Sequence, residues 1–217
     1  MTRVLITGGN RGIGRAMAED ALGRGWDVTV TLRGGNAPEG ARALTLDVTD
    51  RAALGAAAAE IGPVDILINN AGINPAGRQD PLDMDFALFA EVLAVNTLGP
   101  LAAAQAFLPN LRAAGAGRIV NISSQMSFMG YRKPDQIAYR ASKAALNKVM
   151  QGLASRLEAE GIPVVLVDPG WVRTDMGGPA AELDPQQVAR GILDLAARLE
   201  LADTGRFFRH DGTERAF

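Results

Sequence analysis

The sequence predicts an α/β fold, a doubly wound sandwich of three layers around a parallel sheet of seven strands. Short segments rich in valine, isoleucine and leucine alternate with longer helical stretches along the whole chain. The apolar segments are nearly continuous, as they are in strands of a parallel sheet that is buried on both faces. Glycine and polar motifs directly follow these segments, at the strand ends where ligands bind in such sheets. Together these patterns are typical of a Rossmann-type domain.

The first half of the chain supplies four of the expected strands and two helices. Each strand is a short apolar segment bounded by a turn: Arg3–Thr7, Trp26–Leu32, Ala43–Leu46 and Val64–Ile68. One helix, Ile13–Arg24, begins at a glycine-rich turn after the first strand, and the other is the alanine-rich stretch Arg51–Ile61.

The second half supplies three strands and three helices. The strands are Arg118–Ile122, Pro163–Val167 and Arg206–Arg209, and the helices are Phe86–Ala114, Gln136–Glu160 and Pro185–Leu199. The Gly99-Pro100 pair should bend the first of these helices, because proline lacks an N–H donor and crowds the preceding turn. No linker, repeat or low-complexity segment interrupts the alternation, so residues 1–217 are expected to form one domain.

Composition excludes several classes of function. The net charge of −2 gives no electrostatic reason to expect binding to nucleic acid or to an anionic membrane. The absence of cysteine excludes disulfides, thiol catalysis and cysteine-bound zinc, and the single histidine, His210, leaves no histidine cluster for a metal. No uninterrupted apolar run reaches the about 18 residues of a membrane span, and no signal peptide is recognisable. A cytoplasmic location is therefore expected.

A glycine-rich turn, Thr7-Gly8-Gly9-Asn10-Arg11-Gly12-Ile13-Gly14, joins the first strand to the first helix. Glycines allow the backbone to turn tightly and to approach a pyrophosphate, and the helix N-terminus supplies amide donors. The spacing Gly-x-x-x-Gly-x-Gly differs from the common Gly-x-Gly-x-x-Gly fingerprint, and such a turn alone is a weak signal. Its place between the first strand and the first helix favours a dinucleotide site.

The second strand ends in Arg33, without the acidic residue that normally binds a ribose 2′-hydroxyl. Arg33 and Arg11 can instead bind a 2′-phosphate, which favours NADP(H) over NAD(H). The alternative is that both arginines are merely solvated.

Two further strand ends carry polar groups. After the third strand, Asp47 of Asp47-Val48 either accepts a hydrogen bond from an adenine amino group or caps the next helix, as Asp50 also can. Asn69-Asn70-Ala71-Gly72 follows the fourth strand, where buried asparagines need partners. A ribose or a neighbouring strand would provide these partners, and a plain structural turn is the alternative.

Tyr139 and Lys143 lie four residues apart in an expected helix, so their side chains project from the same face. A phenol with a pKa near 10 is too weak an acid for work at neutral pH. An ammonium about 4 Å away would favour the phenolate by roughly 4 kcal/mol and bring the pKa near 7. The pair is a plausible general acid, and the alternative is an ordinary aromatic residue and a solvated lysine.

Taken together, these motifs resemble the short-chain dehydrogenase/reductase family. The resemblance covers essentially the whole chain and rests on motifs that occur in order at five successive strand ends. These are Thr7-Gly8-x-x-x-Gly12-x-Gly14, Asn69-Asn70-Ala71-Gly72, Ser124, Tyr139-x-x-x-Lys143 and Asp168-Pro169-Gly170. The run from Pro169 to Gly178 and the short C-terminus resemble the C-factor and sniffer group of carbonyl reductases.

The resemblance implies roles for individual residues. Tyr139 would be the general acid in reduction and the base in oxidation, Lys143 would lower its pKa and hold the nicotinamide ribose, and Ser124 would hydrogen-bond the substrate oxygen. Asn96 would organise the helix bend and a water that relays protons to Lys143. The expected cofactor-binding residues are Gly8, Asn10, Arg11, Gly12, Ile13, Gly14, Arg33, Asp47, Val48, Asn70, Ala71, Gly72, Tyr139, Lys143, Pro169, Gly170, Val172 and Thr174.

The chain departs from the family pattern in two places. Ser124 lies fifteen residues before Tyr139, a wider spacing than usual, which lengthens the loop beside the substrate. Ser123 is the adjacent candidate, but a one-residue shift turns the side chain to the other face, and the family's serine is the second in Asn-Ile-Ser-Ser. The segment after Thr174 is short, which implies an open pocket and loose substrate choice.

The expected activity is NADP(H)-dependent interconversion of a carbonyl and an alcohol on a small-molecule substrate. A nicotinamide supplies the hydride, while the protein supplies orientation, a proton and hydrogen bonds to the developing charge. The rival interpretation is an NADP(H)-sensing regulatory or signalling protein with little turnover, which would usually lack the tyrosine or the lysine. A nucleotide-sugar epimerase would need a longer chain.

Three smaller expectations concern assembly and the pocket. Small residues in Phe86–Ala114 and Gln136–Glu160 permit close helix contact, and relatives use these helices to form dimers or tetramers; packing on the chain's own sheet is the alternative. A homodimer or homotetramer is expected. The cluster Met126, Phe128, Met129 and Tyr131 is expected to face the substrate, whereas His210 is expected to be solvated rather than to line the pocket.

Overall fold

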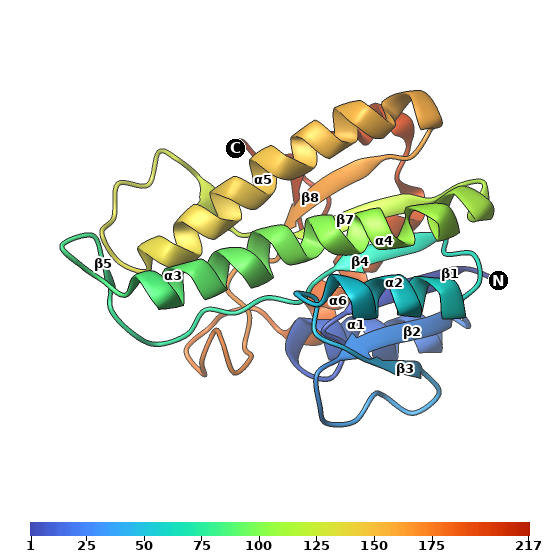
Figure 1. Cartoon of the computed structure of the whole chain (residues 1–217), viewed down its shortest axis with the longest axis horizontal. Coiled ribbons are helices and arrows are strands. Elements are labelled where there is room, and N and C mark those ends of the chain that lie inside the picture. Colours follow the sequence, from blue (N-terminus) through green and yellow to red (C-terminus); the bar gives the residue numbers. More distant parts are fainter.

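A parallel sheet of seven strands forms the centre of the computed structural model, which describes residues 1–217 (Figure 1). The strands are β1 (Arg3–Thr7), β2 (Asp27–Leu32), β3 (Arg42–Thr45), β4 (Ile66–Asn69), β7 (Arg118–Ile122), β8 (Val164–Asp168) and β9 (Phe207–Arg209). Their order is β3-β2-β1-β4-β7-β8-β9, and every neighbouring pair is parallel. The predicted fold class is confirmed, with strand bounds displaced by up to two residues.

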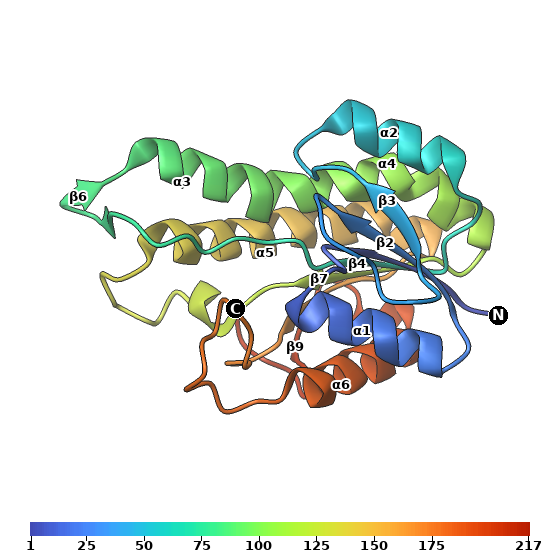
Figure 2. The ribbon, with the colours of Figure 1, turned by 90° about the horizontal axis from the view of Figure 1, so that it is seen from below.

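Helices cover both faces of the sheet, as Figure 2 shows. The helices α1 (Gly12–Gly23) and α6 (Pro185–Arg198) lie on one face, and α2 (Arg51–Glu60), α4 (Gly99–Ala114) and α5 (Ile137–Leu157) lie on the other. Side chains of a strand alternate between the two faces, so Val4 and Ile6 of β1 join one apolar core while Leu5 joins the other. Burial on both faces explains why these strands are continuously apolar.

The long helix predicted at Phe86–Ala114 contains a break that its sequence pattern does not place correctly. It consists of α3 (Phe86–Leu93), a π-helical segment η1 (Ala94–Leu98) and α4, so the irregularity precedes the Gly99-Pro100 pair. Pro100 is tolerated because it lies in the first turn of α4. The irregularity contains Asn96, whose side chain forms hydrogen bonds to other elements, and π segments of this kind are frequent at functional sites.

The same helix is apolar enough to resemble a membrane span by length and composition. Its most apolar window has a mean hydropathy of 1.6, although polar residues interrupt every long apolar run. Phe107 and Leu111 of α4 are fully buried in the apolar core on this face of the sheet. A core helix of this kind passes the same compositional test, which is therefore a weak indication of a membrane span.

Several short elements carry no sequence pattern and were not predicted. A hairpin of two-residue strands, β5 (Gln79–Asp80) and β6 (Asp83–Met84), projects beyond the N-terminal ends of α3 and α5 (Figures 1 and 2). The 3-10 helices η2 (Gln125–Ser127), η3 (Glu158–Glu160) and η4 (Leu201–Asp203) are equally short. Elements of two or three residues are too short for a hydrophobic period to develop.

Candidate active site

The predicted site residues follow the carboxyl ends of adjacent strands, which share one edge of the sheet. The strands β1, β4, β7 and β8 are neighbours or next-neighbours in the sheet order, and all run in the same direction. The glycine-rich turn, Asn69–Gly72, Ser124 and Asp168–Gly170 therefore lie at the same edge. Chain segments far apart in the sequence are brought together there, as expected for a doubly wound sheet.

The glycine-rich turn is shaped for close approach of a ligand. Gly8 and Gly12 have φ angles of 72° and 54°, in the region that glycine adopts without strain. A β-carbon at Gly14 would lie 2.2 Å from the carbonyl oxygen of Gly8, so α1 packs directly against the turn. No side chain caps the N-terminus of α1. The amide groups at this end can therefore meet a phosphate.

Asn70 and Thr7 hold the glycine-rich turn against the end of β4. The side-chain nitrogen of Asn70 donates to the carbonyl oxygens of Thr7 and Gly8 at 2.9 and 3.1 Å. The backbone amides of Asn70 and Ala71 both donate to the Thr7 hydroxyl at 3.0 Å. Asn69 instead donates to Asn121 on the neighbouring strand at 2.9 Å, which is one of the partners that its sequence context left open.

The two arginines expected at a 2′-phosphate are paired with carboxylates in this structure. Arg33 lies 3.5 Å from Asp47, and Arg11 lies 3.6 Å from Asp175. The arginine side chains are 58% and 65% exposed, so neither pair fixes its guanidinium. Both guanidinium groups can turn toward a stronger anion.

Asp47 accepts hydrogen bonds from the amide and the hydroxyl of Thr49, at 2.8 and 2.7 Å, while Asp50 caps α2 through the amide of Ala53. Partial burial would raise the pKa of Asp47, but the Thr49 hydrogen bonds and Arg33 outweigh this and hold it below its usual value. Of the two roles that its sequence position left open, the capping of α2 belongs to Asp50, whereas Asp47 closes a turn and its contact with an adenine amino group stays a prediction.

Tyr139 and Ser124 face one another in the interior of the site. Both are buried, with 8% and 9% of their surface exposed, and the Ser124 side chain stabilises the phenolate form of Tyr139 by hydrogen bonding. The Ser124 hydroxyl oxygen accepts from the amide of Met126 at 3.1 Å, which leaves its proton free for another acceptor. Ser123 is turned away and donates to Asn147 at 2.5 Å. The geometry therefore favours Ser124 over Ser123.

Lys143 does not bring the pKa of Tyr139 near 7 in this structure, so the value expected from the sequence is wrong. Burial raises the pKa of Tyr139 to about 12 and lowers that of Lys143 to about 8. The Lys143 ammonium donates to the carbonyl oxygen of Ile122 at 2.8 Å and lies 5.8 Å from the centre of the Tyr139 ring. The expectation neglected the loss of hydration that both groups suffer. At neutral pH the phenol is therefore protonated and can donate.

Asn96 connects the π-helical segment to the helix that carries Tyr139. Its side chain accepts from the amide of Ile73 at 2.8 Å and donates to the Ile73 carbonyl oxygen at 2.8 Å and to the Ser142 hydroxyl at 3.0 Å. Ser142 in turn donates to the carbonyl oxygen of Tyr139 at 2.7 Å. Asn96 is fully buried, so it fixes the irregular helix segment from within.

The segment after β8 approaches the glycine-rich turn. Gly170 has a φ angle of 78°, and the side chain of Thr174 lies 3.4 Å from the position that a β-carbon on Gly12 would take. Thr174 thus lies beside the glycine-rich turn, whereas contacts of Pro169, Gly170 and Val172 with a cofactor stay predictions. His210 is half-buried rather than solvated, and its ring lies 4.0 Å from the β-carbon position of Gly170.

Large apolar side chains are exposed on the two loops that leave β7 and β8. Met129 and Tyr131 are 81% and 45% exposed, and Trp171 and Met176 are 48% and 50% exposed. Phe128 packs edge-to-face against Tyr131, with 5.2 Å between the ring centres. Part of the cluster predicted to face the substrate is thus open to solvent.

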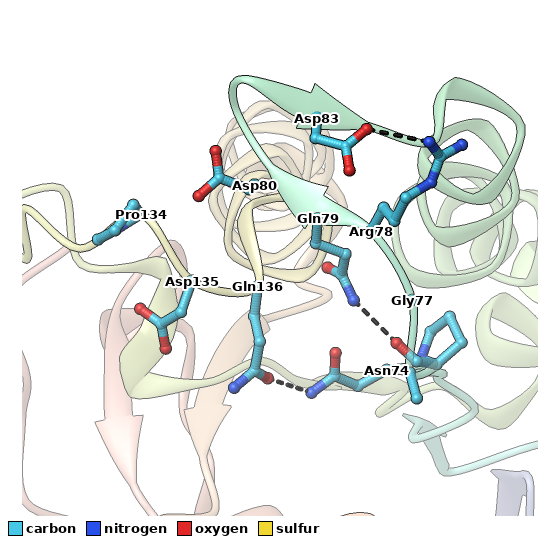
Figure 3. Close-up of a pocket in the computed structure, with 11 residues that line it drawn as sticks. Asn74, Gly77, Arg78, Gln79, Asp80, Asp83, Pro134, Asp135 and Gln136 are labelled. Atoms are coloured by element: carbon cyan, nitrogen blue, oxygen red, sulfur yellow. Dashed lines mark hydrogen bonds and ion pairs between the residues drawn. The ribbon is translucent and has the colours of Figure 1, made fainter.

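A polar pocket of about 450 Å³ lies beside the hairpin β5–β6 and contains none of the predicted site residues (Figure 3). Gln79 lines it and accepts a hydrogen bond from the Tyr139 amide at 3.3 Å. Gln136, which precedes α5 with a φ angle of 52°, accepts from Asn74 at 2.5 Å. These contacts fix the first turn of α5, and no sequence pattern indicates them because they join distant segments of the chain.

The comparisons with known proteins agree with this geometry. The sequence model of short chain dehydrogenases matches residues 2–184. The chain belongs to the short-chain dehydrogenase/reductase family. It is therefore an oxidoreductase by family, and the resemblance inferred from its strand-end motifs is confirmed.

Individual relatives of this short-chain dehydrogenase/reductase cover most of its length. It is 43% identical to C-signal of Myxococcus xanthus over 155 residues, which are 70% of this chain and 92% of the relative. Its structure is similar to the carbonyl reductase Sniffer of D. melanogaster, with a TM-score of 0.92, 29% identity and 100% of both chains covered. It is also similar to an NADPH-bound carbonyl reductase from chicken fatty liver, with a TM-score of 0.90, 30% identity and coverage of 100% and 99%.

Proposed function

We propose that this protein reduces a carbonyl group of a small molecule to an alcohol with NADPH, and catalyses the reverse reaction with NADP⁺. The observation that carries the proposal is the buried Tyr139 phenol facing the Ser124 hydroxyl, with Lys143 one helical turn away. The chicken carbonyl reductase of similar structure binds NADPH, which supports the choice of cofactor. We further propose that residues 1–217 form one domain and that the protein is cytoplasmic.

The residues at the sheet edge fit a dinucleotide. The glycine-rich turn leaves room for a pyrophosphate where side chains would block it, and the uncapped N-terminus of α1 supplies amide donors. The buried Lys143 ammonium has a single protein acceptor, the Ile122 carbonyl oxygen, so two of its protons are free for ribose hydroxyls. The side chains of Arg33 and Arg11 are exposed and can bind a 2′-phosphate.

The site performs the proton transfer of the reaction. A bound nicotinamide cofactor supplies or accepts the hydride. During reduction, Ser124 donates a hydrogen bond to the carbonyl oxygen and Tyr139 donates its proton to the same oxygen as negative charge develops there. The phenolate that remains is stabilised by Ser124 and by the nearby Lys143 ammonium. Asn96 holds the helix segments on which these groups depend.

The regulatory alternative is less well supported. A sensor of NADP(H) would need the glycine-rich end of the site but not the catalytic pair, and here Tyr139, Lys143 and Ser124 are all present and buried together. A panel of aldehydes, ketones and quinones, followed by NADPH absorbance, tests the proposal. Turnover of at least one class supports the enzyme, whereas tight NADPH binding without turnover of any of them supports the sensor.

Cofactor choice gives the first prediction. Arg33→Ala should weaken NADPH binding about tenfold and leave NADH binding unchanged, because only NADPH carries the 2′-phosphate that the guanidinium meets. Dissociation constants from cofactor fluorescence measure both effects. Arg190→Ala, which removes an exposed arginine of α6, is the matched control and should change neither value. Equal affinities of the unmutated protein for NADPH and NADH would rule out the assignment.

Assembly gives the second prediction. We propose a homodimer or homotetramer in which the outer sides of α4 and α5 meet their copies; the two helices run side by side on one face of the sheet (Figure 1). Ala103, Ala104 and Ala154 are buried in the chain's own core, but Ala102 is only half-buried and Gly152 is exposed. The outward-facing small residues support close contact between helices.

Gly152→Arg should weaken this association about tenfold or more, because the new side chain would enter the interface while meeting no atom of its own chain. Light scattering at micromolar concentrations measures the oligomeric state. Gly55→Arg on α2, which also meets no atom within 4 Å, is the matched control. A monomeric unmutated protein would contradict the assembly, and an unchanged Gly152→Arg oligomer would place the interface elsewhere.

A further inference from the structure

A buried carboxylate, Asp168, joins the two loops that flank the catalytic tyrosine. Its side chain is 4% exposed and lies at the end of β8. One oxygen, Oδ1, accepts from the amide of Gln125 at 2.9 Å and from the amide of Gly170 at 3.0 Å. The first of these amides directly follows Ser124, and the second lies in the segment expected along the cofactor. One carboxylate thus fixes the backbone on both sides of the reaction centre.

The cation that balances Asp168 comes from the C-terminal tail, residues 210–217. After β9 the chain reverses at Asp211-Gly212, where Thr213 donates to the Asp211 carboxylate, and returns beside β9. The amide of Arg215 donates to the carbonyl oxygen of Phe207 at 2.7 Å. Its guanidinium then reaches the second oxygen of Asp168, Oδ2, at 3.0 Å.

The arginine is enclosed as well as paired. The Arg215 side chain is only 13% exposed, its guanidinium lies 6.0 Å from the centre of the Phe207 ring, and the ring of Phe217 packs 5.5 Å from Phe207. The Nε nitrogen of Arg215 is buried without a hydrogen-bond partner. Burial of the guanidinium leaves one N–H donor without an acceptor, and the ion pair with a carboxylate inside the protein compensates for this loss.

The charged and titratable groups around Asp168 come from three elements. Arg215 is contributed by the tail, Tyr139 by α5, where the charge of Asp168 adds to burial in raising the pKa of the phenol, and His210 lies near Gly170 at the end of β9. Lys143 is directed to the carbonyl oxygen of Ile122. Arg215 is therefore the cation that pairs with Asp168.

We propose that Arg215 is a positioning residue of the active site, which acts through Asp168 to fix the backbone at Ser124–Gln125 and at Gly170. Removal of the guanidinium would leave a buried carboxylate without a cation. The carboxylate would then draw water into the site, and its hydrogen bonds to the two amides would weaken. This inference rests on the proposed function, since it assigns a consequence to the placement of Ser124 and Tyr139.

Four variants separate the charge from its packing. Arg215→Met keeps much of the length and apolar character of the side chain, whereas Arg215→Lys keeps the charge. Arg215→Met combined with Asp168→Asn removes the buried charge and leaves an amide oxygen to accept from Gln125 and Gly170. Arg209→Met is the matched control, because Arg209 belongs to the same segment and is exposed.

Thermal melting tests the pair without any substrate. At about pH 8, Arg215→Met should melt below the unmutated protein, because a buried carboxylate without its cation destabilises the fold. The double variant should regain most of the melting temperature at pH 8. The proposal would be overturned if the double variant were no more stable at pH 8 than Arg215→Met. This test remains valid if Arg215→Met itself fails to fold.

Catalytic readouts test the positioning. With a compound that the unmutated protein reduces, Arg215→Met should lower kcat about tenfold or more with KM within about threefold, because the misplaced groups act in the transition state. Arg215→Lys should recover most of kcat, because it keeps the positive charge beside Asp168.

Two further results would overturn the proposal. One is a folded Arg215→Met whose kcat and NADPH dissociation constant are both within about twofold of the values for Arg209→Met. The other applies if no compound of the panel is reduced, in which case the proposed function itself fails. Arg215→Met is then still expected to weaken NADPH binding about threefold or more through Gly170, and unchanged binding with unchanged melting would refute its role.

Discussion

Replacement of Tyr139 by phenylalanine should lower the turnover of carbonyl reduction by about two to four orders of magnitude, the usual contribution of a general acid. The substitution removes one hydroxyl from a ring that is only 8% exposed and keeps its packing. The affinity for NADPH should change little, because the phenol acts mainly in the transition state. Steady-state rates from NADPH absorbance and fluorescence titration of the cofactor measure the two effects.

The second tyrosine of the chain provides the control for this experiment. Tyr131 is 45% exposed, and Tyr131→Phe should keep turnover within about twofold if the loop merely contacts the substrate. Retention of more than about a tenth of the turnover in Tyr139→Phe would correspond to a loss below about 1.4 kcal/mol. The phenol would then not be the acid of the reaction.

The fold could be predicted because its signals are local and repeated. Each buried strand is apolar over its whole length, since both faces of the sheet are covered, and each is followed by the polar or glycine residues of a ligand edge. The choice of Ser124 over Ser123 followed from the resemblance to the family, whose serine is the second in Asn-Ile-Ser-Ser. Features of this kind depend on consecutive residues, so a sequence pattern can indicate them.

Contacts between distant segments could not be predicted in the same way. The π-helical segment around Asn96 depends on hydrogen bonds to Ile73 and Ser142, which are distant in the sequence. The pairing of Arg215 with Asp168 depends on a tail that reverses after β9. Neither the asparagine nor the arginine indicates such a contact by its residue type, because both types are usually solvated.

The prediction of the pKa of Tyr139 failed for a related reason. The spacing of Tyr139 and Lys143 indicates that they share a helix face, but it does not show how deeply that face is buried. Burial opposes the charged form of each group, and in this structure it is the largest effect on the pKa of both. The sequence therefore predicts which residues meet, whereas the sign of the pKa shift requires their surroundings.

Replacement of Lys143 by methionine should reduce turnover by about two to three orders of magnitude, since the phenolate that forms at Tyr139 loses its nearest cation. NADPH binding should weaken about tenfold, because two ammonium protons are available for ribose hydroxyls in the unmutated protein. The same substitution should raise the thermal stability at neutral pH, although it removes the hydrogen bond to Ile122. Substitution of an active-site residue that destabilises the fold commonly lowers activity and raises stability.

The sign of the stability change follows from the pKa of Lys143, which burial lowers from 10.5 to about 8. Above the unfolded value the group is neutral in both states and contributes no penalty. As the pH falls toward 8 the unfolded chain takes up the proton more readily, and the folded protein loses at most about 3 kcal/mol. Loss of the Ile122 hydrogen bond offsets about 1 kcal/mol of the gain from methionine.

The net gain should raise the melting temperature by about 5 °C at pH 7, and the gap should close as the pH approaches 10. Lys148→Met, on an exposed position of the same helix, is the matched control and should leave melting, turnover and NADPH binding unchanged. A Lys143→Met protein that melts lower at pH 7, with unaltered NADPH affinity, would show that the ammonium stabilises the fold and does not bind the ribose.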